Sequence, residues 1–254
     1  MSASAFGSDL RAAATHRTPS VRRGLWLSFL SAYGLEAVLG DRLSGATGGG
    51  GSAAIDWLGL DLQHGDLGLD DVIPLLRVAE RVGIPVFPRL ASHAGDAIGK
   101  VVDAGAQGVI VPGVESADEA TALVRAIRLP PLGARSTGSA RTALGVTGTG
   151  EPLLLPMVET AAGLDAAADI AAVDGVDGVF IGPYDLSMSL GCRPGEPDVM
   201  VAIASVIEIA RAAGKIVGMF AGRPDLLEVG PKLDLLAVDT DTSAVRRGIA
   251  DLFA

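Results

Sequence analysis

The sequence predicts an α/β protein with a single (β/α)₈ TIM barrel domain. Eight short apolar runs alternate with amphipathic stretches of helical length from residue 24 to the end of the chain. Eight such units favour a closed barrel over an open doubly wound sheet, and 254 residues is an ordinary length for one barrel. The turn after the first run lacks the G-x-G-x-x-G pattern of a dinucleotide-binding fold.

Several of the apolar runs carry apolar residues at nearly every position, as parallel strands do when helices cover both faces of the sheet. The predicted strands are 24–30, 56–61, 85–89, 108–111, 153–159, 178–182, 216–220 and 235–239. The clearest predicted helices between them are 69–83, 95–105, 116–128 and 197–214.

The domain boundaries follow from composition. Residues 1–23 are rich in Ala, Ser and Arg, and we expect them to form a flexible N-terminal leader before a barrel domain at 24–254. Residues 41–52 contain four consecutive glycines and predict a flexible excursion. Residues 130–152 form a long Gly-rich connection of the kind that is functional or mobile in compact domains. We expect both segments on or near the strand-to-helix side of the barrel.

Composition and charge exclude several classes of partner. A net charge of −10 gives no electrostatic basis for binding nucleic acid or an anionic membrane, so small molecules are the expected partners. The single cysteine, Cys192, forms no intrachain disulfide, and no Cys/His cluster has zinc-ligand spacing. The chain has no secretory signal core and no apolar run of membrane-spanning length. These features predict a cytoplasmic protein.

Polar side chains collect where the predicted strands end. Asp61, Gln63 and His64 follow the second strand, Arg89 closes the third, Glu159 the fifth and Asp185 comes just after the sixth. Active sites of such barrels lie at the carboxyl ends of the strands, so we expect these side chains to converge over one mouth.

Each of these residues also has a purely structural interpretation. Asp185 suits a helix N-cap, Glu159 complements a helix dipole, and His64 and Arg89 are ordinary loop and ion-pair residues when taken singly. Their joint placement favours a shared site, because four unrelated structural explanations would otherwise have to coincide. For the other histidines, His16 and His93, we expect structural roles.

A hard divalent cation explains the two acids together. Mg²⁺ or Mn²⁺ is commonly held by one or two carboxylates, which Glu159 and Asp185 supply, and a 2-oxo acid can fill two further positions. The metal would stabilise an enolate of that acid. Arg89 would hold the developing oxyanion, and His64 would move the proton.

The chain resembles a known family from about residue 24 to its C-terminus. The segments DLQH, PVFPRL, VVDAGAQGVIVP, PPLGARSTGSAR, PMVET, VDGVDGVFIGPYDLSMSLG and AAGK are similar to those of the metal-dependent (class II) pyruvate aldolases. These are the 4-hydroxy-2-oxoheptanedioate aldolase group within the aldolase and citrate lyase β-subunit family. The resemblance implies a lyase that reversibly cleaves a 4-hydroxy-2-oxo acid to pyruvate, or a close 2-oxo acid, and an aldehyde.

The resemblance also implies roles for individual residues. His64 matches the catalytic base, Arg89 the pyruvate-binding arginine, and Asp103 the aspartate that pairs with the histidine. Glu159 and Asp185 match the ligands of a divalent metal, Mg²⁺, Mn²⁺ or Co²⁺, and the backbone of Gly182, Pro183 and Tyr184 matches an element that binds the substrate carboxylate. Gln63 stands where the family has Glu in D-x-E-H, and we expect it among the substrate-binding residues. The family further implies a homohexamer, or a trimer, with an exchanged C-terminal helix.

Three alternatives stay open at this point. A Schiff-base aldolase would need a lysine in the mouth, but Lys100 lies in a predicted helix, and Lys215 and Lys232 precede strands at the opposite rim. A lyase acting on malyl- or citryl-type CoA thioesters would need basic contacts, for which Arg135, Arg141 and Arg193 are the candidates. A non-catalytic descendant of the family would keep the barrel alone.

Overall fold

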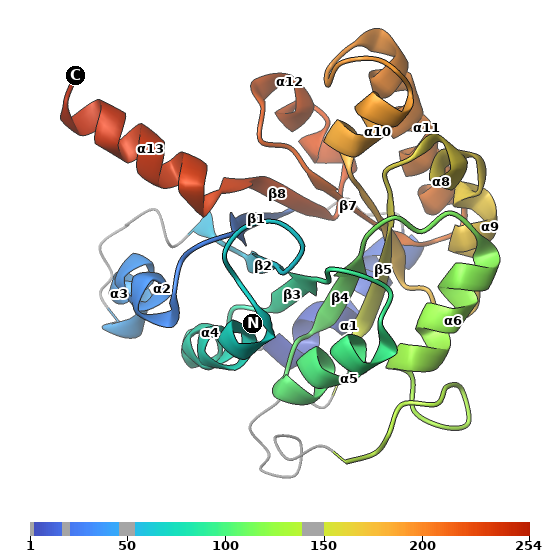
Figure 1. Cartoon of the computed structure of the whole chain (residues 1–254), viewed down its shortest axis with the longest axis horizontal. Helices are drawn as coiled ribbons and strands as arrows, with labels where there is room; N and C mark the ends of the chain where they lie inside the picture. The colour runs from blue at the N-terminus through green and yellow to red at the C-terminus, as the bar shows by residue number, and fades with distance from the viewer. Residues whose placement is uncertain (1–2, 17–20, 46–53, 139–149) are drawn as a thin grey trace.

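The structure, a computed structural model, describes residues 3–16, 21–45, 54–138 and 150–254. Eight parallel strands close into a barrel in the order β1 to β8, as the sequence predicts, and helices surround it (Figure 1). The strands are β1 (Arg22–Leu27), β2 (Trp57–Asp61), β3 (Val86–Arg89), β4 (Gly108–Val111), β5 (Leu153–Val158), β6 (Gly178–Ile181), β7 (Ile216–Phe220) and β8 (Leu235–Thr240). The helices before β5 are α1 (Ala3–His16), α2 (Ala32–Val38), α3 (Gly40–Leu43), α4 (Leu69–Arg81), α5 (Gly95–Ala104) and α6 (Ala117–Ile127). Those after it are α8 (Ala161–Asp165), α9 (Ala167–Ala172), α10 (Pro183–Ser189), α11 (Pro197–Ala212), α12 (Pro224–Leu227), the 3₁₀ helix Gly230–Lys232 and α13 (Asp241–Leu252).

The strand predictions hold closely except at β1. The predicted bounds of β4 and β7 are confirmed, and five other strands differ by one residue at one end. β1 begins two residues earlier than predicted and ends at Leu27 rather than at residue 30. It ends early because the backbone amides of residues 28–30 donate to the side chain of Asp241 instead of to a neighbouring strand.

The barrel interior is a packed core with a column of aromatic rings. Successive rings in this column have centroids 5.7 to 6.4 Å apart. From the amino-terminal end of the strands to the carboxyl-terminal end they are Phe6, Phe87, Trp57, Phe180, Trp26, Phe220 and Tyr184. Two further apolar clusters fill the layer between the strands and the outer helices. The column fills the barrel below its mouth, so the open space described next lies at the strands' carboxyl ends.

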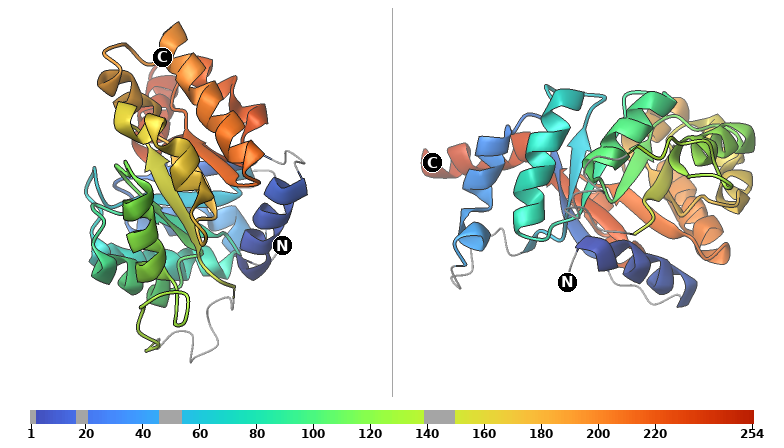
Figure 2. Two further views of the ribbon diagram at one scale, coloured as in Figure 1. Left: turned by 90° about the vertical axis from the view of Figure 1, so that its right-hand side faces the viewer. Right: turned by 90° about the horizontal axis from the view of Figure 1, so that it is seen from below.

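The N-terminal segment differs from the prediction of a flexible leader. Residues 3–16 form helix α1, which lies across the amino-terminal end of the barrel (Figure 2). Phe6, Leu10 and Ala14 are spaced four residues apart and are buried against the barrel core. Three apolar side chains in an Ala- and Ser-rich stretch are a weak sequence signal, and packing against the barrel supplies what the local sequence does not.

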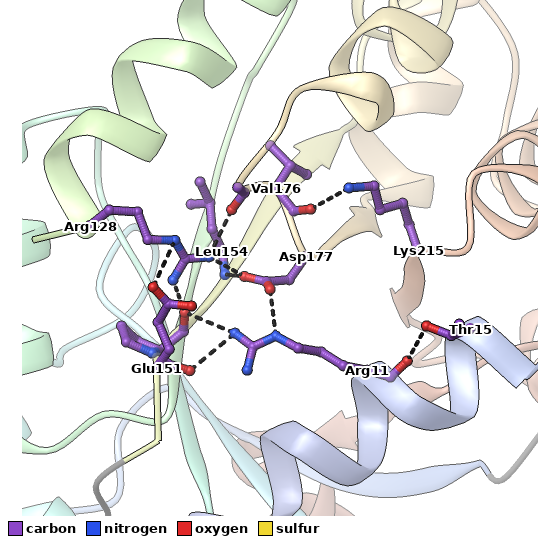
Figure 3. Close-up of polar contacts among 10 residues, drawn as sticks. Arg11, Thr15, Arg128, Glu151, Leu154, Val176, Asp177 and Lys215 are labelled. Atoms are coloured by element: carbon purple, nitrogen blue, oxygen red, sulfur yellow. Dashed lines mark hydrogen bonds and ion pairs between the residues drawn. The ribbon is translucent and has the colours of Figure 1, made fainter. Parts of the chain in front are cut away.

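A polar network fixes α1 to the barrel (Figure 3). Arg11 Nε donates to Asp177 Oδ1 at 2.7 Å, and Arg128 donates to Asp177 Oδ2 at 2.6 Å. The same carboxylate accepts the amide of Leu154 at 2.8 Å, and Arg128 also donates to the carbonyl of Pro152. Arg11, Arg128 and Asp177 are therefore paired in a partly buried cluster, which joins α1, α6 and the starts of β5 and β6.

The structure describes only part of each of the two irregular segments. In the first, the chain forms the short helix α3, and residues 46–53, which include the four glycines, lie outside the described residues. In the second, residues 130–138 follow α6 and turn back through bonds such as that from the amide of Ala134 to the carbonyl of Arg125 at 2.7 Å. Because α6 runs antiparallel to the strands, its end lies at the helix-to-strand side, opposite the mouth. The predicted position is therefore wrong for residues 130–138, and residues 139–149 lie outside the described residues.

The last helix, α13, leads away from the barrel (Figure 1). Its apolar side chains are open to solvent: Ile249 is 53% exposed, Leu252 81% and the following Phe253 86%. Among the described helices, none has the length and apolar character needed to cross a membrane.

Candidate active site

A cavity of about 330 Å³ opens at the carboxyl ends of the strands. Its floor is the top of the aromatic column, and its walls come from the ends of β2, β3, β5, β6, β7 and β8. The lining residues are Trp26, Asp61, His64, Arg89, Met157, Glu159, Phe180, Gly182, Pro183, Tyr184, Asp185, Phe220 and Thr240. The structure therefore brings together seven of the nine residues predicted for the site.

Asp61, the last residue of β2, organises one side of the cavity. Arg89 donates to it from two nitrogens, Nε to Oδ1 at 3.0 Å and an Nη to Oδ2 at 2.5 Å. Trp26 Nε1 donates to Oδ2 at 3.2 Å. The amides of Gln63 and His64 donate to Oδ1 at 3.1 and 3.0 Å, which shapes the turn that follows β2.

The electrostatics of Asp61 follow from these contacts. Burial favours the neutral form of the carboxyl, but the hydrogen bonds and charge of Arg89, with the His64 amide and the Trp26 indole, outweigh it, and the pKa of Asp61 is lowered. Asp61 is thus an anion that holds the Arg89 guanidinium in one place.

Arg89, the last residue of β3, is held from two directions. Its side chain is buried, and its guanidinium carbon lies 5.4 Å from the centroid of the Trp26 ring. The bidentate pair with Asp61 fixes the plane of the guanidinium, and the indole face stabilises its charge. His64 is exposed in the turn after β2 and lies in the cavity wall.

Glu159, which follows β5, has one satisfied and one unsatisfied oxygen. Oε1 accepts the amide of Gly113 at 2.7 Å, whereas Oε2 is buried and has no hydrogen-bond partner in the described residues. Burial is the largest cause of a raised pKa for Glu159, and the negative charge of Asp185 adds to it. A buried carboxylate oxygen without a donor is costly unless something positive binds it.

Asp185 sits in the first turn of α10, next to the end of β6. The N-cap of this helix is Gly182, with Pro183 at the first helical position, so Asp185 does not serve as the N-cap. Asp185 is exposed and lines the same cavity as Glu159.

Gly182 allows the chain to pass close to Glu159. A Cβ atom at Gly182 would lie 2.6 Å from Glu159 Oε2, so any side chain there would displace the carboxylate. Tyr184 turns its hydroxyl to the carbonyl of Ala221 at 3.1 Å, and burial raises the pKa of that hydroxyl. The peptide from Gly182 to Tyr184 forms one wall of the cavity.

The residues present fit a hard divalent cation held by two carboxylates. No group of three or more His, Cys, Asp or Glu residues within the described ranges is arranged as a metal site. Mg²⁺ and Mn²⁺ need no more than one or two protein carboxylates, since water and substrate oxygens complete their shells. The unpartnered Oε2 of Glu159 and the carboxylate of Asp185 on the same cavity meet that requirement.

Two predicted site residues lie outside the cavity. Asp103 is near the C-terminal end of α5, at the amino-terminal end of the barrel, and pairs with Arg135 at 2.6 Å. Asp103 therefore does not orient His64 of the same chain. Helix α5 runs back from the mouth, so its C-terminal end lies on the side of the barrel opposite His64. Gln63 adjoins His64, but its Oε1 is buried and finds no hydrogen-bond partner among the described residues, and Gln63 is not part of the described cavity lining.

The groups that rival mechanisms need are absent from the described lining. Lys215 donates to the carbonyl of Val176 at 2.7 Å, at the amino-terminal end of β7, and neither Lys100 nor Lys232 reaches the cavity. Of the arginines considered for a CoA tail, Arg135 is paired with Asp103, Arg193 does not line the cavity, and Arg141 falls outside the described residues.

Other cavity residues were not singled out from the sequence. Trp26 and Phe220 lie at or near strand ends, and Thr240 ends β8, so the strand-end rule that identified Arg89 would have found them. His93 was expected to be structural, and its Nε2 lies 2.6 Å from the carbonyl oxygen of Pro112.

Comparison with known proteins gives close relatives along nearly the whole chain. A hydroxypyruvate/pyruvate aldolase of Pseudomonas aeruginosa is 36% identical over 252 residues, which cover 93% of this chain and 88% of the relative. A 2-keto-3-deoxy-L-rhamnonate aldolase of Escherichia coli O1:K1 / APEC is 36% identical over 240 residues, which cover 89% and 85%.

Solved structures and a family profile agree with these relatives. The crystal structure of an HpcH/HpaI aldolase/citrate lyase family protein from Burkholderia cenocepacia J2315 matches with a TM-score of 0.78 and 29% identity, over 97% of this chain and 99% of that one. The profile of the HpcH/HpaI aldolase/citrate lyase family matches residues 50–229. With its barrel, its strand-end residues and these relatives, the chain belongs to the HpcH/HpaI aldolase/citrate lyase family.

Proposed function

We propose that the protein is a divalent-metal-dependent aldolase that reversibly cleaves a 4-hydroxy-2-oxo acid to pyruvate, or a close 2-oxo acid, and an aldehyde. Family membership makes it a carbon–carbon lyase, and relatives named for pyruvate-type aldol reactions support the choice of substrate. The observation that carries the proposal is the buried Oε2 of Glu159, which no donor in the described part of the chain reaches and which shares a cavity with Asp185, Arg89 and His64.

Glu159 and Asp185 are the residues that would hold the cation, Mg²⁺, Mn²⁺ or Co²⁺. When bound, the cation supplies positive charge that offsets the negative charge a 2-oxo acid acquires as it loses a proton. The backbone of residues 182–184 would receive the carboxylate of that acid at the wall beside the two ligands.

The protein's own side chains account for the movement of the proton and the electrons. In the cleavage direction His64 accepts the proton of the 4-hydroxyl group, the C3–C4 bond breaks to release the aldehyde, and its electron pair stays with the 2-oxo acid fragment. His64 then delivers that proton to C3, which completes the methyl group of pyruvate and returns His64 to its starting state, so atoms and charge balance. The reverse of this last step exchanges the methyl protons of pyruvate. Arg89, held still by Asp61, lies where it can stabilise the oxyanion of that fragment.

The character of the lining supports an uncharged aldehyde as the second substrate. Trp26, Met157, Phe180 and Phe220 give the described wall an apolar surface, and Arg89 is the one lysine or arginine in it. Because Arg89 is already paired with Asp61, an aldehyde bearing its own carboxylate would find no free cation there.

For the assembly we propose a homo-oligomer, a hexamer or a trimer, in which the exposed apolar side chains of α13 are covered by another copy. The unpaired Cys192 supports a reducing compartment such as the cytoplasm.

Proton exchange on pyruvate tests the function without knowledge of the aldehyde. The protein is incubated with pyruvate in D₂O and Mg²⁺, Mn²⁺ or Co²⁺, and the methyl signal is followed by ¹H NMR. We expect deuteration that chelation of the metal abolishes and that Arg89→Ala slows far more than it weakens metal binding. No deuteration with any of the three metals would contradict the proposal and favour a non-catalytic barrel.

The second substrate is identified by mass spectrometry of products from pyruvate and a panel of aldehydes. We expect products with neutral aldehydes in preference to those carrying a carboxylate. Cleavage of malyl- or citryl-CoA thioesters in place of free hydroxy-oxo acids would reassign the enzyme to thioester substrates.

A further inference from the structure

A buried carboxylate from the end of the barrel holds the loop that follows its first strand. Asp241, the first residue of α13, is 1% exposed. Its Oδ2 accepts the successive amides of Ser28, Phe29 and Leu30 at 3.0, 3.1 and 3.0 Å. Its Oδ1 accepts the hydroxyl of Ser28 at 2.7 Å and the amide of Thr242 at 2.8 Å. Both oxygens are therefore used, and most of their bonds go to residues 28–30.

This loop is in direct backbone contact with the turn that carries His64. The carbonyl of Ser28 accepts the amide of Asp66 at 2.8 Å. Gly65, with a φ of +108°, lets the two backbones approach so closely that a Cβ atom there would lie 2.5 Å from the same carbonyl oxygen. Asp61 holds the start of the turn, and the contact with Ser28 fixes its far end.

The end of β1 and the loop that follows it support the turn that carries His64 at both of its ends. At the start of the turn the indole of Trp26 donates to Asp61, and at its end the carbonyl of Ser28 accepts from Asp66. His64 lies between these two contacts. We infer that Asp241 is a positioning residue of the active site, which fixes residues 28–30 and, through Ser28, the turn that presents His64. The inference rests on the role given to His64 in the proposed function.

The opposite end of β8, the strand that Asp241 follows, offers a matched control. Asp234 directly precedes β8, is fully buried, and accepts the amide of Val217 at 2.9 Å and a nitrogen of Arg211 at 3.3 Å. It resembles Asp241 in residue type, burial and bonding to backbone, but it lies at the amino-terminal end of the barrel. A defect due only to the loss of a buried carboxylate would appear in both variants.

The test compares Asp241→Asn with Asp234→Asn, in the full chain, at a temperature at which thermal unfolding shows both to be folded. An asparagine at 241 directs an NH₂ group at amide donors, so residues 28–30 lose their fixed position. We expect pyruvate deuteration at saturating pyruvate to fall roughly 10- to 100-fold in Asp241→Asn, with little change in the half-saturating pyruvate concentration. Asp234→Asn should exchange at close to the wild-type rate.

A second variant reaches the same contact from the other side. Gly65→Ala should produce the same kinetic defect, and the double variant with Asp241→Asn should be little worse than either alone, because both act through the Ser28 contact. Equal exchange rates in Asp241→Asn and wild type, an equal defect in Asp234→Asn, or fully additive effects would overturn the inference.

An activity-independent measurement separates this inference from the proposed function. The chain has three histidines, so their ring signals can be followed by NMR in protein labelled at histidine. We expect the His64 signals to shift or broaden in Asp241→Asn and Gly65→Ala, whereas the signals of His93, held at the Pro112 carbonyl, stay unchanged. Absence of exchange in the wild type would count against the function alone, and unmoved His64 signals would count against the positioning role alone.

Discussion

Arg89 and Asp61 form a pair that is ordered before substrate arrives. Two hydrogen bonds and the Trp26 ring fix the guanidinium, so little reorganisation is needed when charge develops beside it. We expect Asp61→Asn to lower kcat roughly 100-fold with a smaller change in KM for the 2-oxo acid, because the arginine remains but is no longer held in place. Steady-state kinetics with pyruvate exchange measure this split, and a change confined to KM would contradict it.

Glu159 should destabilise the metal-free protein at neutral pH. Burial and the nearby Asp185 raise the pKa of its carboxyl, so the folded protein binds that proton more tightly than the unfolded chain does. Stability from this group is therefore present below its ordinary pKa of 4.5 and is lost as the pH rises through the raised value. We expect Glu159→Gln to raise the Tm of metal-free protein at pH 7 by roughly 2–4 °C and to have little effect below pH 4.5.

The same variant should lose the thermal stabilisation that Mn²⁺ gives the wild type, since a cation that binds only the folded state raises its Tm. Asp198→Asn, which removes an exposed acid from the first turn of α11, is the matched control and should retain the Mn²⁺ effect. An undiminished Mn²⁺ effect in Glu159→Gln would remove this residue from the metal site.

At the residue scale, the strand-end rule predicted most of the site. His64, Arg89, Glu159 and Asp185 come together because every strand of a parallel barrel ends at the same rim. Asp103 was assigned by motif similarity alone, and a motif on a helix gives no position relative to the mouth. Bonds such as those of Asp241 to residues 28–30 join positions more than 200 residues apart and leave no local pattern in the sequence.

The contribution of helix α1 to the stability of the fold can be tested by truncating one buried side chain. Leu10 is buried against the barrel, and its truncation leaves a cavity that the rigid strands cannot close. We expect Leu10→Ala to cost about 2–5 kcal/mol in the free energy of unfolding, measured with urea, while folded protein keeps its exchange activity. The exposed Val201 of α11 serves as control, because Val201→Ala should change stability by less than about 0.5 kcal/mol. A loss of activity in Leu10→Ala without loss of stability would indicate a different role for α1.

At the same scale, regular strands were predictable and the irregular segments were not. β4 and β7 have the predicted bounds because a short apolar run between turn residues leaves few alternatives. The end of β1 and the helix α1 depend on partners distant in sequence, Asp241 and Asp177 among them. Residues 130–138 were placed at the wrong end because glycine content does not reveal which side of the barrel a loop occupies.

The whole molecule shows an apolar surface that a single chain leaves uncovered. Ile249, Leu252 and Phe253 are exposed on and just after α13. We expect light scattering to find an oligomer. The variant Ile249→Ser/Leu252→Ser/Phe253→Ser should give a smaller assembly, because it removes the apolar side chains whose burial against another copy would stabilise the contact. Met188→Ser, at another exposed apolar position, should leave the assembly unchanged. An unchanged mass for the triple variant would contradict the role of α13.

The proposed reaction depends on a cation held between the ends of β5 and β6. The most direct measurement is an anomalous difference map from a crystal soaked with Mn²⁺ and oxalate, which stands in for the 2-oxo acid. We predict one strong peak within bonding distance of Glu159 and Asp185, with oxalate between the metal and Arg89. A peak elsewhere, or none while oxalate is bound, would contradict it.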